Sequence, residues 1–169
     1  MGLDNMPKTY PCIKEGTAIL NDDGQLNCEA TQKANQCPYQ RELLADPILE
    51  NAIPVYGMFG LDCWYRGKYG NYLLGQMSEH DSSFPYDSYA FYGNDNGDEN
   101  SQGGISESDC LEISETMLSF TDSWTDYVKN YSDVKGNRDQ EKALINDWIY
   151  AAWWLKFVGN YGNGSGVWY

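Results

Sequence analysis

The segment from residue 106 to residue 158 constrains the fold most, because it carries two patterns of an amphipathic helix. Its first half repeats apolar residues at alternating steps of three and four, which places them on one helix face. This apolar stripe consists of Cys110, Ile113, Met117, Phe120, Trp124, Tyr127 and Tyr131. Ser106 and Asp109 resemble a capping box, which predicts the helix start. We therefore expect one long helix here.

The second helix is predicted from about residue 139 to residue 157, after a polar break that contains Gly136. Apolar side chains cover more than half of its circumference, as in a helix buried between several partners. Gly159 is its expected C-cap, because glycine adopts the left-handed conformation without a Cβ penalty. The two helices predict an antiparallel helical hairpin.

The part before this hairpin has weaker patterns. Asp23-Gly24 stands between two short apolar runs within residues 17–28, which predicts a β-hairpin. The predicted fold class is thus α+β, in which a small irregular N-terminal part, with a β-hairpin and cysteines, packs on the C-terminal helical hairpin. We expect a single domain over residues 1–169. Its expected parts are an irregular β and short-helix region with four cysteines (1–79), a polar acidic loop (80–105), two long helices (106–158) and a Gly-rich tail (159–169).

Four of the five cysteines lie in the irregular N-terminal part, at Cys12, Cys28, Cys37 and Cys63. Four thiols in a region with little periodic core predict a tetrathiolate site for zinc or an iron–sulfur cluster, which would contribute folding energy directly. No C-x-x-C pair occurs among them, although zinc sites usually contain one. Two alternatives stay open, namely ordinary buried cysteines and disulfides.

The charge of the chain is strongly negative, with 25 acidic and 11 basic side chains and a formal net charge of −14. This balance speaks against binding of nucleic acids and of anionic membranes, both of which attract Lys and Arg. No basic residue occurs between Lys68 and Lys129, a segment that contains twelve acidic residues. The negative charge is therefore concentrated rather than spread evenly.

A carboxylate-rich surface of this kind steers and binds a basic partner. The chain is thus predicted to be a non-enzymatic acidic binding protein with a basic protein partner. An inhibitor of a nucleic-acid-binding protein, of viral or mobile-element type, fits this size and charge. The alternative is a solvated acidic face. The predicted partner-binding residues are Asp95, Asp98, Glu99, Asp109, Glu112, Glu115, Asp122 and Asp126.

One short segment combines basic and aromatic side chains and predicts a ligand site. An aromatic or Arg plane stacks on a nucleotide base while Lys meets a phosphate, so a small anionic ligand is the expected class. The alternative is a hairpin whose aromatic rings pack in the core. The candidate ligand-binding residues are Trp64, Tyr65, Arg66, Lys68 and Tyr69.

Catalysis is not expected, because His80 is the only histidine and no nucleophile, phosphate-loop or metalloprotease motif is present. A carbohydrate-active hydrolase with two carboxylates remains a further alternative. Neither a secretion signal nor a transmembrane segment is expected, which predicts a soluble cytoplasmic protein. A homo-oligomer through the helices or the C-terminal tail is left open.

Overall fold

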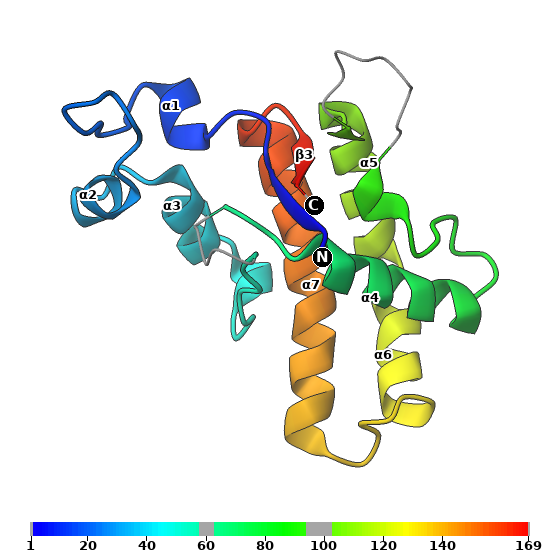
Figure 1. Cartoon of the computed structure of the whole chain (residues 1–169). Coiled ribbons are helices and arrows are strands. Elements are labelled where there is room, and N and C mark those ends of the chain that lie inside the picture. Colours follow the sequence, from blue (N-terminus) through cyan, green and yellow to red (C-terminus); the bar gives the residue numbers. More distant parts are fainter. Residues whose placement is uncertain (1, 58–62, 94–102, 169) are drawn as a thin grey trace.

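The computed structural model describes residues 2–57, 63–93 and 103–168 (Figure 1). This part of the chain contains seven helices and a small antiparallel sheet of three strands, so the predicted α+β class is confirmed. The longest helix, α7 (Arg138–Tyr161), runs through the middle of the molecule. Helices α5 (Glu107–Ser119) and α6 (Thr121–Asn130) follow one another along one side of α7.

The predicted helix starts are found where polar caps occur. The Ser106 Oγ accepts a hydrogen bond from the backbone N–H of Asp109 at 3.1 Å, and the Asn137 Oδ1 accepts one from the backbone N–H of Gln140 at 3.2 Å. Both bonds satisfy an N–H that the helix itself leaves without an acceptor. The segment expected to form one helix is divided at Phe120 into α5 and α6.

Gly159 has a different role from the one expected. Helix α7 continues beyond it to Tyr161, so Gly159 is not the C-cap. A Cβ at this position would lie 3.0 Å from the side chain of Leu111 on α5. Glycine at residue 159 thus lets α5 approach α7 closely.

Two stacked tryptophans hold α6 against α7. The rings of Trp124 and Trp148 lie 4.7 Å apart at 15°, and both side chains are fully buried. The indole N–H of Trp124 donates to the carbonyl of Leu144 at 3.1 Å, and that of Trp148 donates to the carbonyl of Met117 at 2.9 Å. The pair therefore buries a large apolar area with no polar atom left unsatisfied.

The two ends of the chain pair in the sheet. Strand β1 (Asp4–Pro7) and strand β2 (Gly104–Ile105) both pair antiparallel with β3 (Ser165–Trp168), in the order β1-β3-β2. The segment 159–169, expected as a tail, therefore supplies the end of α7 and the central strand. The turn between them needs Gly164 at a φ of +88°, a conformation that side chains rarely adopt.

Short helices occupy the other side of α7, before residue 50 (Figure 1). These are α1 (Pro11–Glu15), α2 (Cys28–Lys33), α3 (Pro38–Ala45) and the 3₁₀ turn η1 (Pro47–Leu49). The hairpin expected within residues 17–28 is reduced to a single antiparallel bridge between Leu20 and Leu26. This region is thus built from short helical turns rather than from strands.

Helix α4 (Gly67–His80) contains the end of the basic-aromatic segment. It begins beside β1 and packs closely against the 3₁₀ turn η2 (Ala90–Tyr92). A side chain at Gly70 would overlap the ring of Phe91, so only glycine lets the two elements meet. This packing fixes the start of α4, where the basic residues of the chain's basic-aromatic segment lie.

Candidate functional sites

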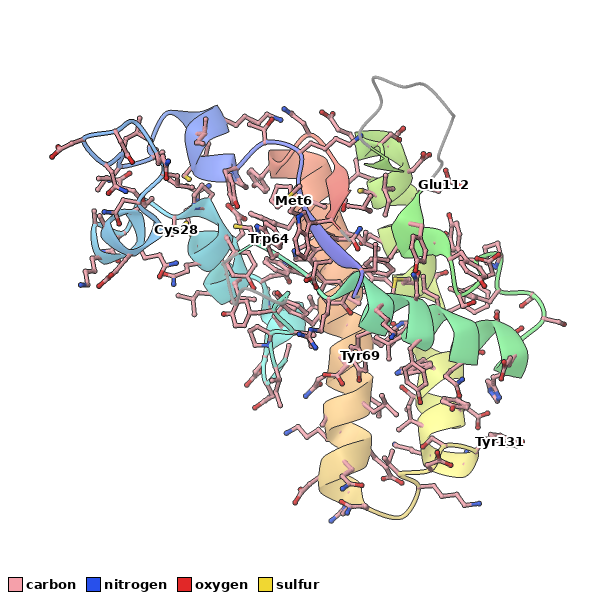
Figure 2. All side chains as sticks on the ribbon, in the orientation of Figure 1. Met6, Cys28, Trp64, Tyr69, Glu112 and Tyr131 are labelled. Carbon is pink, nitrogen blue, oxygen red and sulfur yellow. The ribbon has the colours of Figure 1, made fainter. Side chains whose placement is uncertain are left out.

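Three regions contain the residues singled out from the sequence, and they lie apart from one another. Figure 2 shows this with Cys28 at the start of α2, Tyr69 on α4 and Glu112 on α5. The three regions are the acidic face of α5 and α6, the cavity at the start of α4, and the cysteine cavity of the N-terminal helices.

The acidic face consists of five predicted partner-binding residues on α5 and α6. Four of them are exposed and one is partly buried, while Asp95, Asp98 and Glu99 lie outside the described residues. The five are Asp109, Glu112, Glu115, Asp122 and Asp126. Within the described chain, none of the five is ion-paired with a Lys or an Arg. Their negative charge is therefore not paired with a Lys or an Arg of the described residues.

One member of the acidic face meets the only histidine. The Oδ2 of Asp126 lies 3.3 Å from the Nε2 of His80, which is charged only when protonated. The His80 ring also contacts Tyr127 and Tyr131, with ring centres 5.5 Å and 5.0 Å away. Through these contacts, His80 connects the end of α4 to α6.

A cavity of about 460 Å³ lies beside α5, and it is large enough to admit a side chain of another molecule at the acidic face. Asp87, Asp109 and Glu112 line it together with the rings of Tyr86 and Tyr89. Burial raises the pKa of Tyr86, a hydrogen bond with Thr116 opposes this rise in part, and the negative charges of Glu112 and Asp109 add to it. Carboxylates and aromatic faces both attract a cation. The chemistry of this cavity therefore suits a basic side chain.

The basic-aromatic segment is divided by the structure. Tyr65 is fully buried, and Trp64 is nearly so, with its indole N–H donating to the Tyr10 hydroxyl at 2.8 Å. Both belong to the interior. Arg66, Lys68 and Tyr69 lie at the start of α4 and line one cavity of about 550 Å³.

Three further residues of this α4 cavity, Val55, Tyr72 and Asp147, were not predicted from the sequence. Tyr72 stacks on Tyr69 one helical turn away, with ring centres 6.0 Å apart at 19°. Asp147 comes from α7 and accepts a hydrogen bond from the Tyr69 hydroxyl at 2.6 Å. The i, i+3 spacing signals the tyrosine pair, whereas nothing local connects Asp147 to a residue 78 positions earlier.

The four N-terminal cysteines do come together. Cys12, Cys28, Cys37 and Cys63 all line one small cavity of about 10 Å³, and all are thiols in the structure. Burial raises the pKa of Cys12, and the nearby Cys37 adds to this. Over the described ranges, which include these four residues, no group of three or more His, Cys, Asp or Glu side chains is placed to hold a metal ion.

Cys110 differs from these four cysteines. It is fully buried on α5, and its thiol lies 3.8 Å from the carbonyl of Ile105. Burial raises its pKa to about 12. Since the thiolate is the reactive form, Cys110 is expected to react slowly.

Comparison of the chain with models of protein families, with curated proteins and with solved structures finds no match. Among the helices described here, none is long and apolar enough to cross a lipid bilayer. The function is therefore inferred from the chemistry of the three regions.

Proposed function

We propose that the protein binds a basic partner protein through the acidic face of α5 and α6. The observation that carries this proposal is the cavity beside α5, where Asp87, Asp109 and Glu112 surround space next to two tyrosine rings. A solvated acidic face needs no such hollow. A Lys or Arg of the partner enters the cavity, where its charge meets the carboxylates and its stem lies against Tyr86 and Tyr89.

The remaining carboxylates of the acidic face contribute mainly to the rate of association. Glu115 and Asp122 are exposed and form no ion pair with the described residues, so their field reaches into solvent. Such charges steer a basic partner toward the cavity, and salt screens them over about 8–10 Å. A partner whose basic surface binds nucleic acid has matching chemistry, and in that case the protein acts as an inhibitor.

The test compares two variants with the same change in net charge. Asp109→Asn with Glu112→Gln alters the cavity, and Asp22→Asn with Glu50→Gln alters exposed residues far from it along the chain. We expect the first variant to lose at least about tenfold in affinity for an arginine-rich peptide and for a partner purified from the native host. The second variant should bind almost as the wild type does.

Salt dependence provides a second readout. Binding of the wild type should weaken steeply between low and high ionic strength, because the partners attract one another by charge. An equal loss of affinity in both variants would mean that binding depends on net charge alone, and this would refute a specific site. An affinity that does not change with salt concentration would contradict the proposal as well.

A further inference from the structure

The cavity at the start of α4 is a wide, open depression with the volume of a small-molecule site. Its volume of about 550 Å³ lies within the range of about 300–1,000 Å³ that is typical of ligand pockets. Its walls come from α4, from α7 and from the segment before residue 57. The lining residues are Val55, Arg66, Lys68, Tyr69, Tyr72 and Asp147.

Positive charge at this cavity is not neutralised by ion pairs. Arg66 and Lys68 are exposed, and neither forms an ion pair with any residue that the structure describes, although acidic side chains outnumber basic ones by 25 to 11. Arg66 is also the N-cap of α4, and the first turn of this helix contains no acidic residue. The partial positive charge of the helix end adds to both side chains. The start of α4 is therefore locally positive on a negative protein, since Asp147 is the single carboxylate beside Arg66 and Lys68 among the lining residues.

The aromatic wall is held in a fixed position. The Tyr69 hydroxyl donates to the Asp147 Oδ2 at 2.6 Å, which ties α4 to α7 and sets the ring. Tyr72 lies nearly parallel to it and is 49% exposed. A half-exposed ring backed by a fixed one is a platform on which a planar group stacks at low entropic cost.

A buried polar atom lies behind this wall without a partner. The Tyr65 hydroxyl is fully buried and forms no hydrogen bond with the described residues. Burial raises the Tyr65 pKa, and the charges of Tyr69, Tyr150 and Asp147 raise it further, so these groups are its neighbours. Buried hydroxyl groups are nearly always satisfied in native proteins. The Tyr65 hydroxyl is thus an exception to this rule, and it lies close to Tyr69 and Asp147 of the cavity wall.

We propose that the α4 cavity binds a small molecule with a planar ring and a phosphate group, of the mononucleotide class. The ring stacks on Tyr72, and the phosphate meets Arg66 and Lys68. Asp147 accepts hydrogen bonds from amino or hydroxyl groups of the ligand. A polynucleotide is a poor ligand, because its backbone is repelled by a net charge of −14.

Titration calorimetry on the full chain tests this proposal with three probes: adenosine 5′-monophosphate, adenosine and inorganic phosphate. We expect saturable binding of the nucleotide and at least about tenfold weaker binding of each part alone, since each lacks one of the two contacts. No heat with the nucleotide would overturn the proposal, as would adenosine binding as tightly as the nucleotide. Tighter binding of a ten-residue single strand of DNA would assign the cavity to nucleic acid instead.

Variants locate the binding. Arg66→Ala and Lys68→Gln should each weaken nucleotide binding about tenfold. Both replace exposed side chains that form no ion pair with the described residues, so folding is retained. Tyr72→Ala should weaken it about as much through lost stacking. The matched control is Arg138→Ala, an exposed arginine at the start of α7. Equal affinity in the Arg66 variant and in this control would place the ligand elsewhere.

The test is independent of the acidic face. The α4 cavity shares no lining residue with the cavity beside α5, so nucleotide binding and partner binding succeed or fail separately. Asp109→Asn with Glu112→Gln should leave nucleotide affinity unchanged. A loss of nucleotide binding in that variant would contradict the placement of the ligand at α4.

Discussion

The side-chain amide of Asn5 donates a hydrogen bond to the Ser165 hydroxyl at 2.9 Å, although 160 positions separate the two residues. The same amide donates to the carbonyl of Phe91 at 2.8 Å, and the backbone of Asn5 exchanges two hydrogen bonds with Tyr65. One buried residue of β1 thus connects β3, the turn η2 and the segment before α4. The start of α4, and with it the basic cavity, is held in place from the N-terminal strand.

Replacement of Asn5 by alanine should therefore reduce the free energy of unfolding by about 2–4 kcal/mol, because it removes two buried hydrogen bonds and leaves the Phe91 carbonyl without this donor. Urea denaturation measures the change. Asn160→Ala is the control, since Asn160 is exposed at the end of α7 and should change stability by less than about 0.5 kcal/mol. Equal effects of the two substitutions would show that Asn5 is not the connection described here.

The sequence predicted the helices of the C-terminal part because their signals are local. The Ser106 cap and the apolar stripe up to Trp124 depend only on neighbours within a few turns. Strand β3 could not be predicted this way, because a Gly-rich segment becomes a strand only when residues 4–7 pair with it. Such long-range pairing overrides local propensity.

The residues of the predicted ligand site likewise differ in whether local sequence or tertiary packing places them. Arg66, Lys68 and Tyr69 are close in sequence and share a cavity, whereas Asp147 joins them only through the packing of α4 against α7. Trp64 and Tyr65 lie in the same segment yet belong to the interior. Composition shows which side chains are suited to a ligand, but only tertiary packing decides which of them face the cavity.

The stacked pair of Trp124 and Trp148 gives the second prediction on stability. Trp124→Ala should lower the free energy of unfolding by about 3–5 kcal/mol, since it removes a fully buried ring and leaves a void between α6 and α7. Tyr131→Ala, at an aromatic side chain that is 67% exposed, is the matched control and should lose about 1 kcal/mol or less. Guanidinium denaturation monitored by circular dichroism measures both. Comparable losses would place Trp124 outside the core.

Two carboxyl groups should titrate in opposite directions from the ordinary value. Partial burial raises the pKa of Asp147, and the Tyr69 hydrogen bond opposes this rise only in part. Hydrogen bonds from Ser83, with a further one from Ser123, lower the pKa of Asp81. Carbon-detected NMR titration of the side-chain carboxyls should therefore find Asp147 above and Asp81 below the value of about 3.9 for an unperturbed aspartate.

The consequence for stability has opposite signs at the two positions. Folded Asp147 holds its proton more tightly than the unfolded chain does, so its contribution falls as pH rises from the unfolded pKa through the folded one. Folded Asp81 holds its proton less tightly, so its contribution is present above the unfolded pKa and is lost as pH falls through the folded one. Relative to the wild type, Asp147→Asn should gain stability as pH rises above about 4, and Asp81→Asn should lose it. Parallel pH profiles for the two variants would contradict these shifts.

The predicted tetrathiolate remains a prediction, because the four cysteines share a cavity but are not placed to hold a metal ion in the described conformation. Binding of zinc or of an iron–sulfur cluster at Cys12, Cys28, Cys37 and Cys63 requires the thiols to turn toward one centre and to lose their protons. Elemental analysis of protein purified without chelators should then find about one zinc ion, or the iron of about one cluster, per chain. Cys28→Ser should lose the metal, whereas Cys110→Ala should retain it. Metal-free wild-type protein would refute the site.

Alkylation should distinguish Cys110 from the other cysteines by its burial and its raised pKa, which do not depend on a bound metal. Iodoacetamide reacts with the thiolate, and a fully buried thiol with a pKa of about 12 forms almost none at neutral pH. Cys28 and Cys37 are only partly buried and should react first in metal-free protein. Peptide mass spectrometry over a time course should therefore label Cys110 last, on the timescale of unfolding rather than of thiol chemistry. Labelling of Cys110 as fast as Cys28 would mean that α5 separates from β2 far more often than a core helix does.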